Sequence, residues 1–209
     1  MDILLDSGSS LQQRDYTLII DQSESMGIVE EGGKTRWELI QDATLALATQ
    51  CEQFDPDGLT IYLFANHFTR YDKVTSTIVP KIFEENEPSG KTYLTPVLKH
   101  ATDSYFMRRA TGSSQLNGET IIVITAGEVM SPQGLKDVII NAANQLQRDE
   151  EMAISLIQVG DNPEVTQFFR VLDNELQQEG AKFDICDTLT LANMATISLT
   201  DVLLNAIVD

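Results

Sequence analysis

Residues 16–25 read YTLIIDQSES, a short apolar and β-branched run that ends on an acid and continues into hydroxyl side chains. Runs of this kind are typical of buried strands in a parallel sheet, whose two faces are both covered. In open sheets of this class, ligands bind beyond the carboxyl ends of the strands. The stretch therefore predicts a central strand over residues 16–21 and a site where that strand ends.

Similar runs recur along the chain and alternate with helical signals. Further strands are expected at residues 59–64, 120–125, 154–159 and 183–186, with a short edge strand at 68–71 and a polar connection at 82–91. Helix starts are expected at the capping boxes 35–38 and 198–201, and at the Thr95-Pro96, Ser131-Pro132 and Asn162-Pro163 pairs. The alternation predicts an α/β fold: an open, doubly wound, mostly parallel sheet with helices on both faces and one short antiparallel edge strand. Residues 14–209 are expected to form this domain, after an N-terminal tail at residues 1–13.

The charge of the chain limits its partners. It has 14 Lys and Arg against 32 Asp and Glu, a net charge of −18. Such a charge repels phosphate backbones and anionic membranes, so we expect neither nucleic-acid nor membrane binding. No apolar run approaches the roughly 18 residues of a membrane helix, and the first residues are acidic where a signal peptide would be basic. We therefore expect a cytoplasmic protein, with Cys51 and Cys186 as buried free thiols.

The end of the first predicted strand carries Asp21, Ser23 and Ser25, one oxygen-bearing side chain at every second position. Such hard oxygen ligands suit Mg²⁺, Mn²⁺ or Ca²⁺. Here the chain resembles the von Willebrand factor A family, whose metal-ion-dependent adhesion site begins with Asp-x-Ser-x-Ser after the first strand. The resemblance covers about residues 14–207, and within it residues 156–184 are similar to the last strand-helix-strand portion of bacterial intracellular members. By its match to the family's second loop, Thr92 is the third hydroxyl ligand, while Thr95 is better explained as a helix cap.

The chain departs from the family at the third loop. Where the family has Thr-Asp-Gly, this sequence has Thr125-Ala126-Gly127, followed by Glu128. The missing carboxylate leaves three outcomes open: a site with reduced affinity for the cation, a site in which Glu128 compensates, or a domain that has kept the shape and lost the metal.

The resemblance implies a protein–protein interaction module and not an enzyme. Its cation would be held by Ser23, Ser25 and Thr92, with Asp21 acting through water, and would accept an acidic side chain of the partner. Two alternatives are a metal-independent scaffold, which Ala126 favours, and a Mg²⁺-dependent phosphatase or phosphotransferase with Asp21 as nucleophile. The sequence predicts no particular partner and no oligomeric state.

Overall fold

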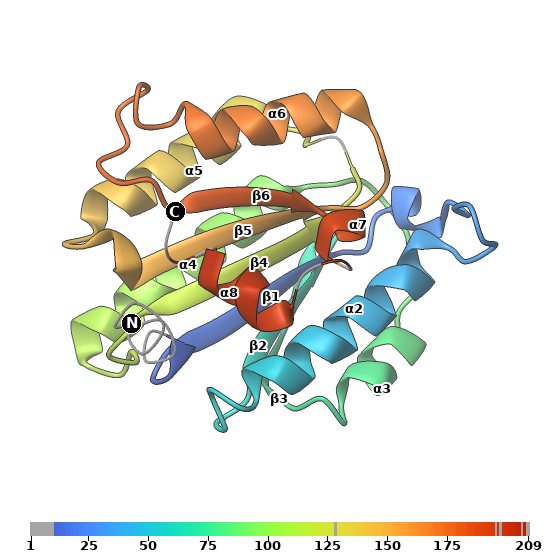
Figure 1. Cartoon of the computed structure of the whole chain (residues 1–209), viewed down its shortest axis with the longest axis horizontal. Helices are drawn as coiled ribbons and strands as arrows, with labels where there is room; N and C mark the ends of the chain where they lie inside the picture. The colour runs from blue at the N-terminus through green and yellow to red at the C-terminus, as the bar shows by residue number, and fades with distance from the viewer. Residues whose placement is uncertain (1–10, 128, 195, 197, 206, 208–209) are drawn as a thin grey trace.

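The computed structural model describes residues 11–127, 129–194, 196, 198–205 and 207. These residues form a six-stranded sheet with the strand order β3-β2-β1-β4-β5-β6 (Figure 1). Neighbouring strands run parallel except β3, which pairs antiparallel with β2 at one edge. The strands are β1 (Asp15–Asp21), β2 (Leu59–Phe64), β3 (Phe68–Val74), β4 (Glu119–Thr125), β5 (Met152–Gln158) and β6 (Cys186–Thr190).

Helices cover both faces of this sheet, which confirms the predicted fold class. One face packs against α2 (Arg36–Cys51), α3 (Val79–Glu84) and α8 (Leu199–Asn205), with α7 (Leu191–Met194) beside β6. The other face packs against α4 (Leu94–Thr111), α5 (Pro132–Gln145) and α6 (Pro163–Asn174). Short 3-10 turns lie at η1 (Glu24–Gly27) and η2 (Asp149–Glu151).

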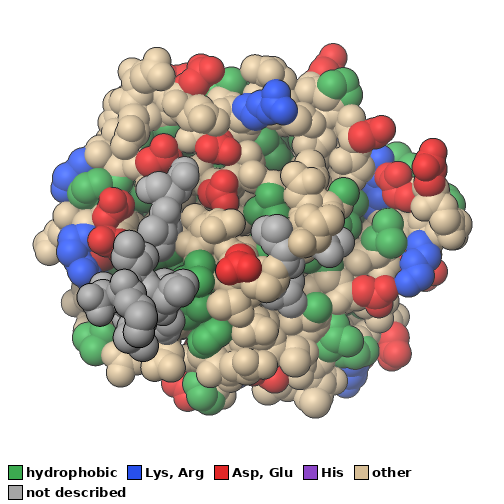
Figure 2. All heavy atoms as spheres, in the orientation of Figure 1, with side chains coloured by type: hydrophobic (Ala, Val, Ile, Leu, Met, Phe, Trp, Pro, Cys, Tyr) green, Lys and Arg blue, Asp and Glu red, His purple; other side chains and the backbone are tan. Residues whose placement is uncertain are grey.

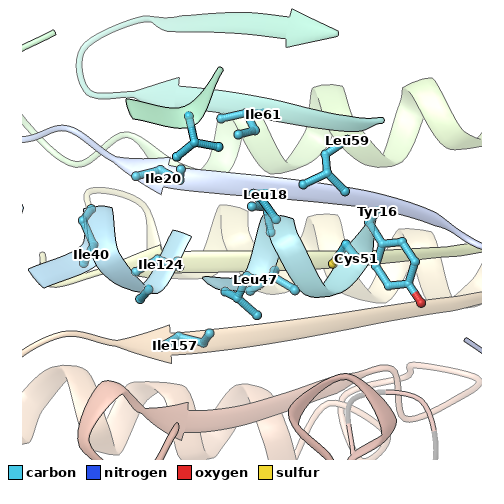
Figure 3. Close-up of a cluster of buried hydrophobic side chains, with 14 of the residues drawn as sticks. Tyr16, Leu18, Ile20, Ile40, Leu47, Cys51, Leu59, Ile61, Ile124 and Ile157 are labelled. Atoms are coloured by element: carbon cyan, nitrogen blue, oxygen red, sulfur yellow. The ribbon is translucent and has the colours of Figure 1, made fainter. Parts of the chain in front are cut away.

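The alternation of side chains along β1 explains why the strand is central. Tyr16, Leu18 and Ile20 point to the α2 face, whereas Ile19 belongs to the core cluster beneath α4 and α5. Figure 3 shows the first set packed with Ile40, Leu47 and Cys51 of α2. Successive strand residues face opposite sides of the sheet, so a strand covered on both sides carries apolar residues on both of its faces.

The strand order places a topological switch between β1 and β4. From β1 the chain moves first toward β2 and β3, then returns to the other side of β1 and continues outward through β4, β5 and β6. Connections on opposite faces diverge at such a point and leave a crevice beyond the carboxyl ends of the two strands. This edge lies on the right of Figure 1, where the chain leaves β1 and enters α2.

Most helix starts lie where the sequence predicts them. Thr35 and Glu38 form a reciprocal capping box on α2, Asn162 caps α6, and Ser198 accepts from the backbone N–H of Asp201 at the start of α8. Ser131 precedes α5, whose first residue is Pro132. The side chains of Thr35, Asn162 and Ser198 satisfy backbone donors that have no partner within the helix, whereas the Ser131 side chain makes no capping hydrogen bond.

The Thr95 prediction is wrong. The helix α4 already begins at Leu94, with Tyr93 in the capping position, so Thr95 lies in its first turn and its hydroxyl donates to the carbonyl of Ser131 (3.3 Å). Pro96 is tolerated because the first four helical N–H groups have no intrahelical acceptor.

Three other boundaries differ from the prediction. The last strand is β6 and not residues 183–186, because pairing with β5 begins near Ile185 and continues toward Thr190. Most residues of β6 are half-exposed and polar, so the sequence there lacks the apolar run that predicts a buried strand. The expected connection at 82–91 begins inside α3, where Val79, Ile82 and Phe83 are buried beside a run of glutamates. The edge strand β3 extends to Val74, beyond the expected residues 68–71.

Both cysteines are buried and reduced, as the sequence predicts. Among the described residues, no helix is both long enough and apolar enough to cross a bilayer. Leu11 and Arg14 are buried against the domain. The boundary after residue 13 stays a prediction, since residues 1–10 lie outside the described part of the chain.

Candidate functional site

The carboxylate of Asp21 lies at the switch point, bridging the ends of β1 and β4. The Thr125 hydroxyl donates to its Oδ2 (2.6 Å) and the backbone N–H of Ser23 donates to its Oδ1 (2.7 Å). Asp21 is fully buried, and this burial raises the pKa of its carboxyl group, while the hydrogen bonds from Thr125 and Ser23 act in the opposite direction. Asp21 therefore fixes the turn after β1 but has no free face toward solvent.

A second loop is held against the turn after β1 by backbone hydrogen bonds. The N–H of Ser89 donates to Gln22 O (2.7 Å), and the N–H of Glu24 donates to Gly90 O (3.0 Å). Gly90 has φ +78°, and a Cβ there would come within 2.9 Å of the Asn66 amide. Only glycine meets both requirements without strain.

Asn66, which follows β2, fixes the same loop from its other side. Its Oδ1 accepts a hydrogen bond from the backbone N–H of Lys91 (3.0 Å). The next residue, Thr92, is thereby directed into the switch-point crevice, where it is 5% exposed.

Three hydroxyl groups meet in this crevice: Ser23, Ser25 and Thr92, here called the hydroxyl cluster. Ser23 Oγ lies 2.9 Å from Ser25 Oγ, and Thr92 Oγ1 donates to Ser23 Oγ (3.1 Å). Ser23 and Thr92 are 69 positions apart in the sequence, so their contact depends on the β1–β2 arrangement and on the loop geometry just described. The structure brings all three predicted hydroxyls together, with Asp21 behind them.

The third loop closes the crevice from the β4 side. A Cβ on Gly127 would lie 2.0 Å from Thr92 Oγ1, so glycine is required for Thr92 to occupy its place. Ala126 is 4% exposed and belongs to the core on the α2 face, while it also borders the crevice. It offers no oxygen where a carboxylate would otherwise stand.

The donor spacing fits a small divalent cation. Mg²⁺ binds oxygens at about 2.0–2.1 Å in an octahedron, which sets neighbouring ligands about 2.9 Å apart. The two measured hydroxyl separations agree with that edge. Hydroxyl groups that hydrogen-bond to each other have the same separation, so the spacing fits both a metal site and a metal-free cluster.

The charge of the donor set is low for a cation site. Asp21 supplies the only carboxylate in contact with the cluster among the described residues, and both of its oxygens already accept hydrogen bonds. No group of three or more His, Cys, Asp or Glu side chains in the described part of the chain is placed to hold a metal. The residues thus fit a cation held mainly by neutral oxygens, for which low affinity is expected.

The hydroxyl cluster opens into a cleft of about 430 Å³. Ile28 and Met130, each 49% exposed, line it from two loops. Its described ionisable side chains are Arg36, Lys91 and Asp161. Arg36 forms an ion pair with Glu30, whereas Lys91 is exposed and forms no salt bridge with a described residue.

Glu128, the candidate for a compensating ligand, lies outside the described residues. Sequence reasoning missed several residues that shape the crevice: Asn66, Thr125, Arg36 and Lys91. The sequence does carry a signal for Asn66 and Thr125, because both lie at or just beyond the carboxyl ends of predicted strands, where ligands bind in this class of sheet. Nothing in the local sequence distinguishes Lys91 or Arg36 from ordinary surface charges.

Neither a family model nor a curated protein matches this chain. Solved structures do. The manganese-loaded TRAP protein of Plasmodium vivax is 17% identical, with 91% of this chain and 74% of that chain covered and a TM-score of 0.57. A variant of the PilB minor pilin of Streptococcus sanguinis is 12% identical, with 92% and 59% covered and a TM-score of 0.58.

The pilus adhesin SpaC of Lactobacillus rhamnosus GG is a further structural neighbour, 10% identical, with 93% of this chain and 30% of that chain covered and a TM-score of 0.59. The chain thus spans 59% of the pilin and less than a third of the adhesin. At such identities the likeness shows the fold alone, because one fold hosts many functions.

Proposed function

We propose that this chain is an interaction module of the von Willebrand A type, which binds a partner protein at the carboxyl edge of its sheet with the help of a divalent cation. The observation that carries the proposal is the convergence of Ser23, Ser25 and Thr92, whose hydroxyl oxygens lie 2.9 and 3.1 Å apart at the switch point. These are the residues that the sequence resemblance names.

Each residue has a separate task in this proposal. The hydroxyl cluster supplies the direct oxygen ligands, and the buried Asp21 carboxylate behind them supplies negative charge. Thr125 and the Ser23 backbone hold Asp21 in place, and Gly127 leaves room for Thr92. A cation bound there supplies a positive centre that accepts a carboxylate oxygen from the partner.

The structural neighbours are consistent with this proposal, but their low sequence identity means that they support the fold and not the function. The TRAP chain is loaded with manganese, and SpaC is a pilus adhesin. We place the module in the cytoplasm, consistent with its two buried, reduced thiols.

A metal-independent scaffold is the second candidate, and Ala126 favours it. The third loop lacks its carboxylate, and both Asp21 oxygens are already hydrogen-bonded, so the cluster is satisfied without an ion. A phosphotransferase that uses Asp21 has less support, because a fully buried carboxylate cannot reach a substrate as a nucleophile must.

Calorimetric titration of the chelator-treated protein with Mg²⁺, Mn²⁺ and Ca²⁺ tests the proposal. We expect saturable binding at one site, lost in Ser23→Ala and kept in the control Ser89→Ala, whose exposed side chain lies outside the cluster. Ala126→Asp should strengthen binding by adding a carboxylate. If the native protein binds no cation but Ala126→Asp does, the metal-free scaffold replaces the proposal.

A further inference from the structure

A second hollow lies beside the cleft of the hydroxyl cluster. It measures about 210 Å³, and its wall is mostly apolar: Val129, Pro132, Val165 and Phe168, with Gly127 and Glu164. Gly127 borders both hollows, so they share a wall at the third loop. A cavity of about 150 Å³ already holds a benzene ring. The hollow is therefore large enough for a leucine, methionine or phenylalanine side chain.

The neighbouring cleft presents two cations, Arg36 and Lys91, and one carboxylate, Asp161, on a strongly acidic molecule. The chain carries −18, yet the cleft presents Lys91 as an exposed cation without a salt bridge to any described residue. The other cation, Arg36, is engaged with Glu30, and its guanidinium lies against Gly160. Lys91 is thus the cation available to an incoming anion.

Exposed apolar side chains gather at the same edge. Four of the eight large hydrophobic residues that are exposed in the described part of the chain belong to the loops around the hydroxyl cluster: Ile28, Val29, Tyr93 and Met130. Exposed apolar groups concentrated beside a pocket mark interaction surfaces. Such a rim favours a polypeptide partner over a free anion.

We propose that the partner segment carries an acidic side chain next to an apolar one. The carboxylate pairs with Lys91 above the hydroxyl cluster, and the apolar side chain fills the hollow between the third loop and α6. This inference rests on the proposed function, since it names the partner chemistry for the same edge. It adds two recognition elements that act with or without a cation: Lys91, and the apolar hollow lined by Phe168.

Short peptides with blocked termini test this inference on the full chain. One peptide has the core Leu-Glu between Gly-Ser flanks, and two control peptides have Leu-Gln or Ala-Glu in the same flanks. Dissociation constants come from NMR shifts of the Gly127 and Lys91 amides, measured in Mg²⁺ and again in chelator. We expect Leu-Glu to bind about tenfold more tightly than either counterpart. In chelator, Lys91→Ala should remove the preference for Glu over Gln but keep the preference for Leu over Ala. Phe168→Ala should remove the preference for Leu over Ala but keep the preference for Glu over Gln.

Matched variants guard against loss of folding. Lys81→Ala removes an exposed lysine on α3, and Phe106→Ala truncates a half-buried phenylalanine on α4; neither should change any preference. If the Glu preference appears only in Mg²⁺, depends on Ser23 and ignores Lys91 and Phe168, the inference is wrong and the proposed function stands. If no peptide binds in either condition, the inference is also wrong, and the calorimetric cation titration decides the proposed function separately.

Discussion

Asp21 and Thr92 show how single positions at the switch point depend on one another. Asp21 holds the turn after β1 through its own oxygens, while Thr92 depends on three neighbours: Gly90, Asn66 and Gly127. The cluster is therefore sensitive to residues that bear no ligand atom.

Gly127→Ala is the sharpest test of that dependence. The new methyl group would overlap Thr92 Oγ1, so we expect Thr92 to move, cation binding to weaken, and stability to fall by about 1–3 kcal/mol. Urea unfolding and calorimetry measure the two effects. Gly27→Ala is the control, because a Cβ there would have Pro88 at 4.0 Å as its nearest contact. Unchanged cation binding in Gly127→Ala would show that Thr92 is not a ligand.

Asp55 makes stability depend on pH. Burial, and then the charge of Asp15, raise the pKa of its carboxyl group to about 6. The folded state thus binds this proton more tightly than the unfolded state, whose value is about 3.9. Stability from this group is fully present below about pH 3.9, the unfolded pKa, and is lost as pH rises to the folded pKa of about 6.

Asp55→Asn should therefore raise the urea midpoint at pH 7 and leave it nearly unchanged at pH 4. Asparagine keeps an oxygen for the Asp57 backbone hydrogen bond, so the turn should survive. Equal pH dependence in the two proteins would contradict the assignment.

At the scale of elements, the edge opposite the site is tied together by a buried charge. Glu119 at the start of β4 is 1% exposed, accepts from the Thr17 hydroxyl of β1 (2.6 Å) and pairs with Arg108 of α4 (2.6 Å). The Glu119 carboxylate thus joins β1, β4 and α4, the helix that follows the loop carrying Thr92.

Removing Arg108 should leave that charge buried without its cation. We expect Arg108→Leu to lower the free energy of unfolding by about 3 kcal/mol, and the double change Arg108→Leu/Glu119→Gln to recover much of the loss. Chemical denaturation of the single and double variants measures the coupling. Additive losses would mean that the pair contributes no net interaction.

At the scale of the whole molecule, charge opposes the compact state. Acidic side chains are scattered over the face shown in Figure 2 and do not form one patch. With a net charge of −18, self-repulsion should destabilise the fold at low ionic strength.

Raising NaCl from about 20 to 200 mM, with chelator present, should raise Tm by roughly 2–4 °C, the equivalent of about 1 kcal/mol for a chain of this size. MgCl₂ at matched ionic strength, without chelator, should raise Tm further in the native protein but not in Ser23→Ala. Differential scanning calorimetry measures both effects. Identical curves in the two salts would argue against a specific cation site.

The sequence by itself determined the α/β class, the central strand β1, the caps of α2, α5 and α6, and the identity of the hydroxyl residues. Most of these follow from local patterns: apolar runs covered on two faces, capping side chains a few positions apart, and alternate oxygens after a strand for Ser23 and Ser25. Thr92 came from the family resemblance. The same patterns failed at α3 and β6, where half-exposed segments carry weak apolar signals.

Only the tertiary structure decided how those pieces meet. It placed Thr125 against Asp21 across 104 positions and Asn66 behind the Thr92 loop. It also placed Lys91 in a cleft that adjoins an apolar hollow at Gly127. Such contacts depend on strand order and on the face that each crossover takes, which no local pattern encodes. A local motif specifies which atoms a chain can offer, and the packing of distant segments specifies which of them share a site.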